Sequence, residues 1–337
     1  MVTLARWLGP WADASRAPRV AVREDDESGV RVRIYGCTAA DRTFLIAPGL
    51  HYAGPDDPRM DRFCRVLAAA GHQVIAPFVP SYLALTPDAR ALTDFERVFL
   101  ARERWSATRP IVFSISFGSL LALALAARHG DAIDRLVLFG PYADFHDTMR
   151  FCLTGEVSSG RLATRDPLNQ PVVLMNLLAH LEPACADPDA LRAAWRRYVE
   201  ATWGRPEMKA RARFGEVADH LAPDVPASVR ELFLVGVGTR PGAADLARAA
   251  LTRFDARALD PTPYLAAVRG RVDLVHGTDD DVIPFEQTHA LAAQLTNADV
   301  RVHITGLYGH TGAQRPPLSA AARELVTMVR VLRVLAG

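Results

Sequence analysis

Residues 114–118, Ser-Ile-Ser-Phe-Gly, could set a serine nucleophile on a sharp turn. They follow a short apolar run and precede a helical segment, and such a turn requires this strand–turn–helix context. Because the turn is tight, the residues two before and two after the nucleophile must be small. Ser114 and Gly118 meet this condition around Ser116, whereas taking Ser114 as nucleophile would put Val112 in the first small position. The spacing therefore favours Ser116.

A carboxylate and an imidazole that could activate this serine follow later apolar runs. Asp279, Asp280 and Asp281 come directly after one such run, and three adjacent acids leave the choice open by one residue either way. His310 follows the last predicted strand. A glycine just before it, Gly309, would let the loop bring the ring over the nucleophile.

These residue types together allow nucleophilic catalysis. A serine hydroxyl is a weak nucleophile at neutral pH, so a neutral imidazole must take its proton during attack on a carbonyl. The ring then returns the proton to the leaving group, while a carboxylate fixes its tautomer and stabilises the imidazolium that forms. The chain order serine, acid, histidine is the order expected at the strand ends of such a sheet.

In these stretches the chain resembles the α/β-hydrolase family, the esterase-like and lipase-like serine hydrolases with a helical cap. The resemblance runs from about residue 20 to the C-terminus apart from an insertion, with Ser114 where the family usually has glycine. In the family's acid loop, His-Gly is followed three residues later by the acid and then by an apolar–Pro pair, which selects Asp280. The resemblance thus implies Ser116 as nucleophile, His310 as general base and acid, and Asp280 as orienting acid.

Other polar residues near these stretches are given different roles. Asp144 stands where the family offers a second location for the acid, and we expect Asp280 rather than Asp144 to hold the role. Asp279 and Asp281 are interpreted as solvated loop acids that cap the following helix. His276, whose backbone belongs to the strand end, is expected to be structural.

The resemblance also implies an oxyanion hole of backbone N–H groups. The family takes one donor from the residue after the nucleophile, here Phe117. The other comes from the loop after the third strand, here residues 48–51, in which Leu50 is the expected donor. This loop has Pro-Gly where the family commonly has His-Gly. His51 could contact the substrate, and a hydrogen-bonded structural histidine is an equal alternative.

The hydrophobic pattern indicates the elements that must position these residues. Residues 20–23 and 30–35 are predicted to form an antiparallel edge hairpin with its turn at 25–29. Short apolar runs, most of them followed by a helical segment, occur at 43–47, 73–77, 111–114, 136–139, 272–276 and 300–304. Strands buried on both faces and joined by helices predict an α/β fold with a mostly parallel, doubly wound sheet. The resemblance implies that this sheet is the α/β-hydrolase fold.

The alternation of strands and helices is interrupted after residue 140 by a long insertion. Its helical periodicities lie at 172–181, 189–202, 227–235 and 243–254, and its apolar content argues against a disordered linker. We predict a core of residues 17–141 and 262–337, a helical cap of 142–261 and an N-terminal segment of 1–16. The cap is expected to be a mobile lid that sets substrate choice. Leu177 and Leu178 could line an acyl pocket in it, or pack the cap onto the core.

Composition excludes several classes of function. The 337 residues are half apolar, enough for a large core with a subdomain. The 39 basic and 38 acidic residues nearly cancel, which argues against nucleic acid as a partner and leaves a small-molecule acyl substrate as the expectation. The four cysteines form no Cys-x-x-Cys pair and no zinc-ligand spacing, so no metal site is predicted. A serine nucleophile needs no bound cofactor, and none is predicted.

The N-terminal residues lack the continuous apolar run of a signal peptide or membrane span. A cytoplasmic protein without an integral membrane segment is therefore predicted. The N-terminal segment is expected to pack on its own domain, the alternative being a short amphipathic helix that touches a membrane or a partner. The sequence does not set the oligomeric state.

Hydrolysis of a carboxylic ester or thioester follows most directly from an acyl-enzyme on Ser116. The same triad would serve an acyltransferase, in which an alcohol or amine replaces water. It would also serve an amide-cleaving peptidase, although no acidic cluster in the predicted cap would obviously hold a substrate amino group. A ligand receptor that keeps the triad without turnover is the alternative from another class, since fold does not fix function.

Overall fold

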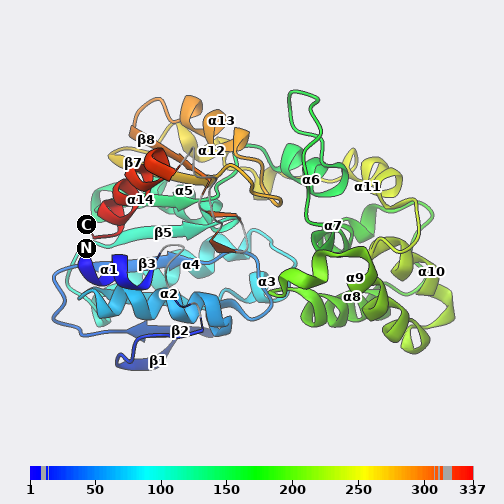
Figure 1. Ribbon diagram of the computed structural model, residues 1–337, viewed down its shortest axis with the longest axis horizontal. Coiled ribbons are helices and arrows are strands. Elements are labelled where there is room, and N and C mark those ends of the chain that lie inside the picture. The colour runs from blue at the N-terminus through cyan, green and yellow to red at the C-terminus, as the bar shows by residue number, and fades with distance from the viewer. Residues whose placement is uncertain (9–12, 14, 307, 310–311, 314–320, 337) are drawn as a thin grey trace. The chain divides into compact units, whose positions relative to one another are not determined.

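The computed structural model describes residues 1–8, 13, 15–306, 308–309, 312–313 and 321–336 (Figure 1). Within it the chain forms two compact units. The sheet unit consists of Met1–Asp144, Ala258–Asp280 and Phe285–Gly337, and the helical unit of Phe145–Arg257 and Asp281–Pro284. Ser116 and Asp280 both belong to the sheet unit.

The sheet unit is built on eight strands in the order β1-β2-β4-β3-β5-β6-β7-β8. β2 runs antiparallel to both of its neighbours, and all other neighbouring strands are parallel. This order is that of the α/β-hydrolase fold, so the predicted fold class is confirmed. The strands are β1 (Val22–Glu27), β2 (Val30–Tyr35), β3 (Thr43–Ala47), β4 (Gln73–Pro77), β5 (Ile111–Ile115), β6 (Arg135–Phe139), β7 (Arg271–Gly277) and β8 (Asp299–Thr305).

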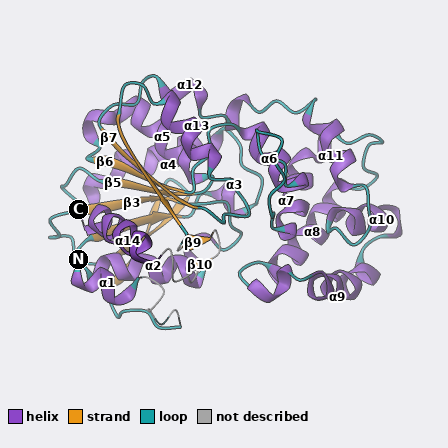
Figure 2. Ribbon diagram, turned by 45° about the horizontal axis from the view of Figure 1, so that its top comes forward, coloured by secondary structure: helices purple, strands orange, loops and turns teal. Residues whose placement is uncertain are grey.

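Helices cover both faces of this sheet, because its central strands are apolar on both sides (Figure 2). One face carries α1 (Val2–Trp7), α2 (Pro58–Ala69) and α14 (Ala321–Ala336), and the other α4 (Arg90–Leu100), α5 (Gly118–His129), α12 (Thr262–Leu265) and α13 (Glu286–Gln294). The short α3 (Pro80–Leu83) precedes α4. α5 is apolar nearly all round and buried from Gly118 to Ala126, as expected of a helix inside a core.

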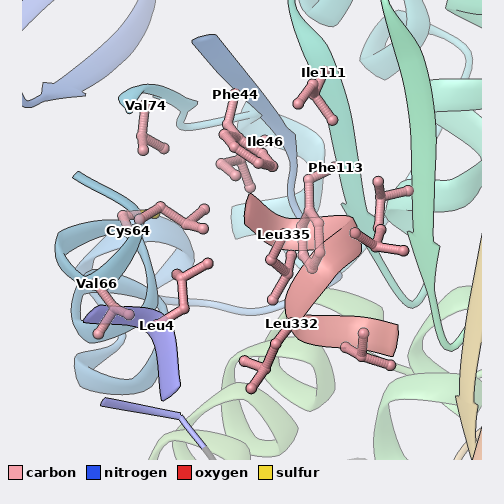
Figure 3. Packing of buried hydrophobic residues seen from close by; sticks show 14 of the residues in the cluster. Leu4, Phe44, Ile46, Cys64, Val66, Val74, Ile111, Phe113, Leu332 and Leu335 are labelled. Carbon is pink, nitrogen blue, oxygen red and sulfur yellow. The ribbon is translucent and has the colours of Figure 1, made fainter. Parts of the chain in front are cut away.

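The core under α1, α2 and α14 includes the N-terminal helix (Figure 3). Leu4 is fully buried and belongs to the same apolar cluster as Cys64 of α2 and Leu335 of α14. The first helix therefore packs on its own unit, which was the favoured of the two expectations. No described helix is long and apolar enough to cross a membrane.

The edge hairpin differs from its prediction in length and turn. β1 continues through three acids to Glu27, and the turn shrinks to Ser28 and Gly29, both at positive φ. Distant donors hold these acids in the strand: the Trp105 indole N–H donates to Asp25 Oδ2 at 2.6 Å, and Arg104 pairs with both Asp25 and Glu27. A local pattern of charged residues gives no sign of partners that lie about eighty positions away.

The helical unit is built from six helices of more than seven residues in its described part. They are α6 (Phe145–Thr154), α7 (Gln170–Leu177), α8 (Pro188–Thr202), α9 (Arg211–Leu221), α10 (Ala227–Gly236) and α11 (Ala243–Leu251). Four of them match the predicted periodicities. Trp195 of α8 is fully buried, and a Cβ atom at Gly236 would lie 2.4 Å from its ring, so α8 and α10 approach closely only because that residue is glycine.

Candidate active site

Ser116 stands on a strained turn between β5 and α5. Its φ is +52°, a left-handed conformation that few residues other than glycine adopt, and its N–H donates to Phe139 O at 2.8 Å. A Cβ atom at Gly118 would lie only 2.2 Å from Ala47 O and 2.6 Å from Pro48 O. The residue two after Ser116 must therefore be glycine, and this is the close approach that the sequence motif predicts.

The residue two before Ser116 is also confined. Ser114 is fully buried, in register with Ala47 on β3 and Leu138 on β6. Its hydroxyl finds no hydrogen-bond partner within the described part of the chain. The site thus uses the small size of Ser114 and not its hydroxyl.

The loop after β3 lies against this turn. A Cβ atom at Gly49 would lie 3.6 Å from Ser116 Cβ and 3.2 Å from Ile115 O, so residues 48–50 pass directly beside the serine. Leu50, the predicted second oxyanion donor, follows in this loop and is partly buried.

Phe117, the predicted first donor, is the N-cap residue of α5. The N–H groups of a helix's first turn have no acceptor within the helix, and the helix dipole makes this end favourable for negative charge. The carbonyl of Phe117 accepts a hydrogen bond from the Tyr82 hydroxyl at 3.0 Å, and its ring centroid lies 5.1 Å from that of Tyr142. Aromatic side chains thus hold the residue that follows the serine.

His51 has partners for both ring nitrogens within its own loop. Nδ1 accepts from the Ala53 N–H at 3.2 Å, which leaves the ring proton on Nε2, 3.3 Å from Asp57 Oδ2. Burial lowers the pKa of His51 to about 4, against the opposing effect of Asp57. The ring is therefore neutral at neutral pH and hydrogen-bonded, as the alternative of a structural histidine requires. That His51 contacts the substrate stays a prediction.

Asp280 is buried at the carboxyl ends of β6 and β7. A Cβ atom at Gly140, just after β6, would lie 3.5 Å from Asp280 Oδ2. The ring of His276, at the end of β7, places Nε2 3.5 Å from the same oxygen, and its Nδ1 lies 2.6 Å from Thr288 Oγ1. Gly140 N–H donates to Val275 O at 2.8 Å, which joins the two strand ends. His276 is fully buried, as expected for a structural residue.

The competing acids have other surroundings. Asp144 is exposed, and its N–H donates to Gln287 Oε1 at 2.9 Å. Asp279 is exposed, as predicted, but it does not cap the following helix, because α13 begins without a side-chain cap. The interpretation of Asp281 as a solvated helix cap is wrong: its carboxylate pairs with Lys209, and α13 begins without a side-chain cap. Lys209 is 72 positions away, so no local pattern indicated the pair.

His310, the predicted base, lies outside the described residues. The segment before it is held by a residue that the sequence analysis did not single out. Glu324 of α14 is buried, and its carboxylate accepts from the Thr305 hydroxyl at 2.7 Å and from the Gly306 N–H at 3.0 Å. β9 (Tyr308–Gly309), which pairs with β10 (Gly312–Ala313), lies beside β7.

Leu177 and Leu178, the predicted acyl-pocket residues, end α7 and begin the 3₁₀ turn Leu178–His180. Both are buried. Their contact with a substrate stays a prediction. No group of three or more His, Cys, Asp or Glu side chains among the described residues could hold a metal ion.

No protein-family model matches this chain, and no curated protein matches its sequence. Solved structures resemble it at low identity. A serine hydrolase from the bacterium Cycloclasticus zankles is 15% identical over 94% of this chain and 98% of its own, with a TM-score of 0.45. A putative lipase from Acinetobacter baumannii is 15% identical over 94% and 92%, with a TM-score of 0.48. An esterase from Pyrococcus furiosus is 15% identical over 98% and 95%, with a TM-score of 0.48. These likenesses assign no residue and no substrate to this chain.

Proposed function

We propose that the chain is a serine-dependent hydrolase that cleaves a carboxylic ester or thioester through an acyl-enzyme on Ser116. The observation that carries the proposal is the backbone of Ser116, held at a φ of +52° where β5 meets α5. Such a conformation costs about 1–3 kcal/mol and persists only where surrounding structure enforces it, most often at functional sites. Here the Ser116 N–H bond to Phe139 O holds the turn, and the absence of a side chain at Gly118 lets it lie against the carbonyls of Ala47 and Pro48.

The proposed reaction has two steps. Ser116 Oγ attacks the substrate carbonyl while His310 accepts the hydroxyl proton, and the carbonyl oxygen becomes an oxyanion. The C–O or C–S bond to the leaving group then breaks, and His310 returns the proton to it. In the second step water, deprotonated by the same ring, attacks the acyl carbonyl. The bond between the acyl carbon and Ser116 Oγ then breaks, His310 returns the proton to Ser116 Oγ, and the acid is released.

Two further groups support this chemistry. The buried carboxylate of Asp280 would fix the tautomer of His310 and stabilise the imidazolium. The N–H groups of Phe117 and Leu50 would donate to the oxyanion, favoured by the N-terminus of α5 beside the serine. Neither role needs a metal or a cofactor.

The helical insertion is proposed to set acyl choice. It leaves the sheet unit just after β6, and ligands of open α/β sheets bind at the carboxyl ends of the strands. Leu177 and Leu178 are the residues proposed to contact the acyl chain. The same proposal includes the predicted cap boundaries, residues 142 and 261, and the motion of the cap as a lid.

Rapid-mixing kinetics with nitrophenyl esters test the acyl-enzyme. The wild-type chain should release a burst of nitrophenol equal to the enzyme concentration, followed by steady turnover. Ser116→Ala should lose the burst and at least about 10³-fold in turnover while keeping its thermal unfolding temperature. Comparable turnover in the alanine variant would overturn the proposal, and reaction of Ser116 with a fluorophosphonate in a chain that turns over no ester would indicate a binding protein.

A further inference from the structure

The only lysine of the chain pairs with Asp281, the residue that follows the predicted catalytic acid in the sequence. Among 39 basic residues all but Lys209 are arginine. Lys209 Nζ contacts Asp281 Oδ2 and lies 3.1 Å from Asp166 Oδ2. The side chain of Asp166 is only 6% exposed, so in this ion cluster one ammonium serves two carboxylates, one of them buried.

Hydrogen bonds to backbone atoms also hold the segment Asp281–Pro284. The Asp166 N–H donates to Asp281 O at 2.7 Å, and the Cys152 thiol donates to Val282 O at 3.2 Å. Ile283 is fully buried. Residues Asp281–Pro284 therefore fold as part of the helical unit, although they are separated from its other residues by β7.

The charge balance of the cluster depends on Lys209. Burial lowers the pKa of Lys209, but Asp166 and Asp281 outweigh it, so the pKa lies above its ordinary value of 10.5 and the group stays charged. Without the ammonium, the buried Asp166 carboxylate would face Asp281 uncompensated, and breaking such a pair by removing one partner is strongly destabilising. Lysine suits this position because it is a compact point charge that two oxygens from different segments can share.

We propose that Lys209 is a positioning residue for the catalytic acid. Lys209 joins Asp281 to Asp166 and so fixes the position of Asp281. Asp280 precedes Asp281 in the chain, and neighbouring Cα atoms are about 3.8 Å apart, so a shift of Asp281 moves Asp280 as well. Asp280 is in turn placed beside His276 and Gly140. This inference rests on the proposed function, in which Asp280 orients His310.

The test compares Lys209→Met and Asp281→Asn with a matched control on the same loop, Asp279→Asn, whose side chain is exposed. Both cluster variants should lose between about 10-fold and 100-fold in kcat with KM nearly unchanged, since a misplacement of about 1 Å is enough for such a loss. The acid limb of the pH–kcat/KM profile should move to lower pH, because an imidazole that loses its carboxylate binds its proton less tightly. The control should behave as the wild type, and Lys209→Arg should restore part of the activity.

A second readout needs no activity. Amide hydrogen exchange over residues 279–284, measured by mass spectrometry, should rise in Lys209→Met and Asp281→Asn and not in Asp279→Asn. If Lys209→Met does not fold, Asp281→Asn decides, since it keeps the pair between Lys209 and Asp166.

Unchanged kcat and exchange in both cluster variants would overturn the inference. A lower unfolding temperature with an unmoved acid limb would also overturn it, because that result describes a merely structural ion pair. Failure of the proposed function gives a different result: no nitrophenol burst in the wild type, whatever the exchange shows.

Discussion

Replacing Gly118 by alanine should damage both stability and catalysis, because the new methyl group has nowhere to go. Its Cβ would lie 2.2 Å from Ala47 O, whereas real Cβ atoms essentially never come within 3.0 Å of such an atom. The obstacle is backbone, so α5 must separate from the end of β3 and the loop that follows it by about 0.8 Å (3.0 − 2.2 Å) or more.

The size of the effect follows from that displacement. Overpacking against rigid backbone should cost about 3 kcal/mol of unfolding free energy, which lowers the unfolding temperature by roughly 6–12 °C in a unit of this size. The loop that moves carries Leu50, one of the proposed oxyanion donors. A misplacement near 1 Å should therefore lower kcat for a nitrophenyl ester by about 10²-fold.

The matched control is Gly130→Ala at the other end of the same helix. Gly130 has φ −50° and ψ −39°, and a Cβ atom there meets nothing within 4 Å. This change should keep full activity and add about 0.5 kcal/mol of stability by restricting the unfolded chain. If calorimetry and steady-state kinetics show that Gly118→Ala has the same stability and activity as Gly130→Ala, the inference that position 118 has no room for a side chain is wrong.

Three further comparisons test the remaining assignments. Asp280→Asn should lower kcat by about 10³-fold to 10⁴-fold, and Asp144→Asn by less than about twofold; steady-state assays that show the reverse order would move the acid to the end of β6. Ser114→Ala should keep kcat and raise the unfolding free energy slightly, by up to about 1 kcal/mol, because it removes an unpartnered buried hydroxyl. Leu177→Phe or Leu178→Phe should shift the preferred acyl length across a nitrophenyl ester series while a small activated ester is cleaved at a similar rate. An unchanged length profile would assign acyl choice to the loops of the sheet unit.

The sequence predicted those features that depend on neighbours in the chain. The alternation of apolar runs and helical segments predicted the sheet, because burial on both faces dictates composition along each strand. The small residues around Ser116 predicted the serine turn because the motif itself spans only five positions, although the carbonyls that leave glycine as the only fit at Gly118 belong to the distant Ala47 and Pro48.

Features that depend on distant partners were not predictable in this way. Asp281 was misassigned because Lys209, which pairs with it, lies 72 positions away, and a run of three acids looks the same whether solvated or paired. Glu324 was missed for the same reason, as it bonds Thr305 and Gly306 from the last helix. The unusual feature that could have pointed to the ion cluster is that Lys209 is the only lysine of the chain.

The residue that a covalent serine reagent modifies decides whether Ser116 is the nucleophile. The wild-type chain would be treated with a fluorophosphonate, digested and analysed by tandem mass spectrometry, with nitrophenyl ester hydrolysis followed in the same sample. We expect one phosphonate adduct per chain, on Ser116, and loss of hydrolysis in proportion to the adduct formed. An adduct on another serine, or hydrolysis that survives complete modification of Ser116, would contradict it.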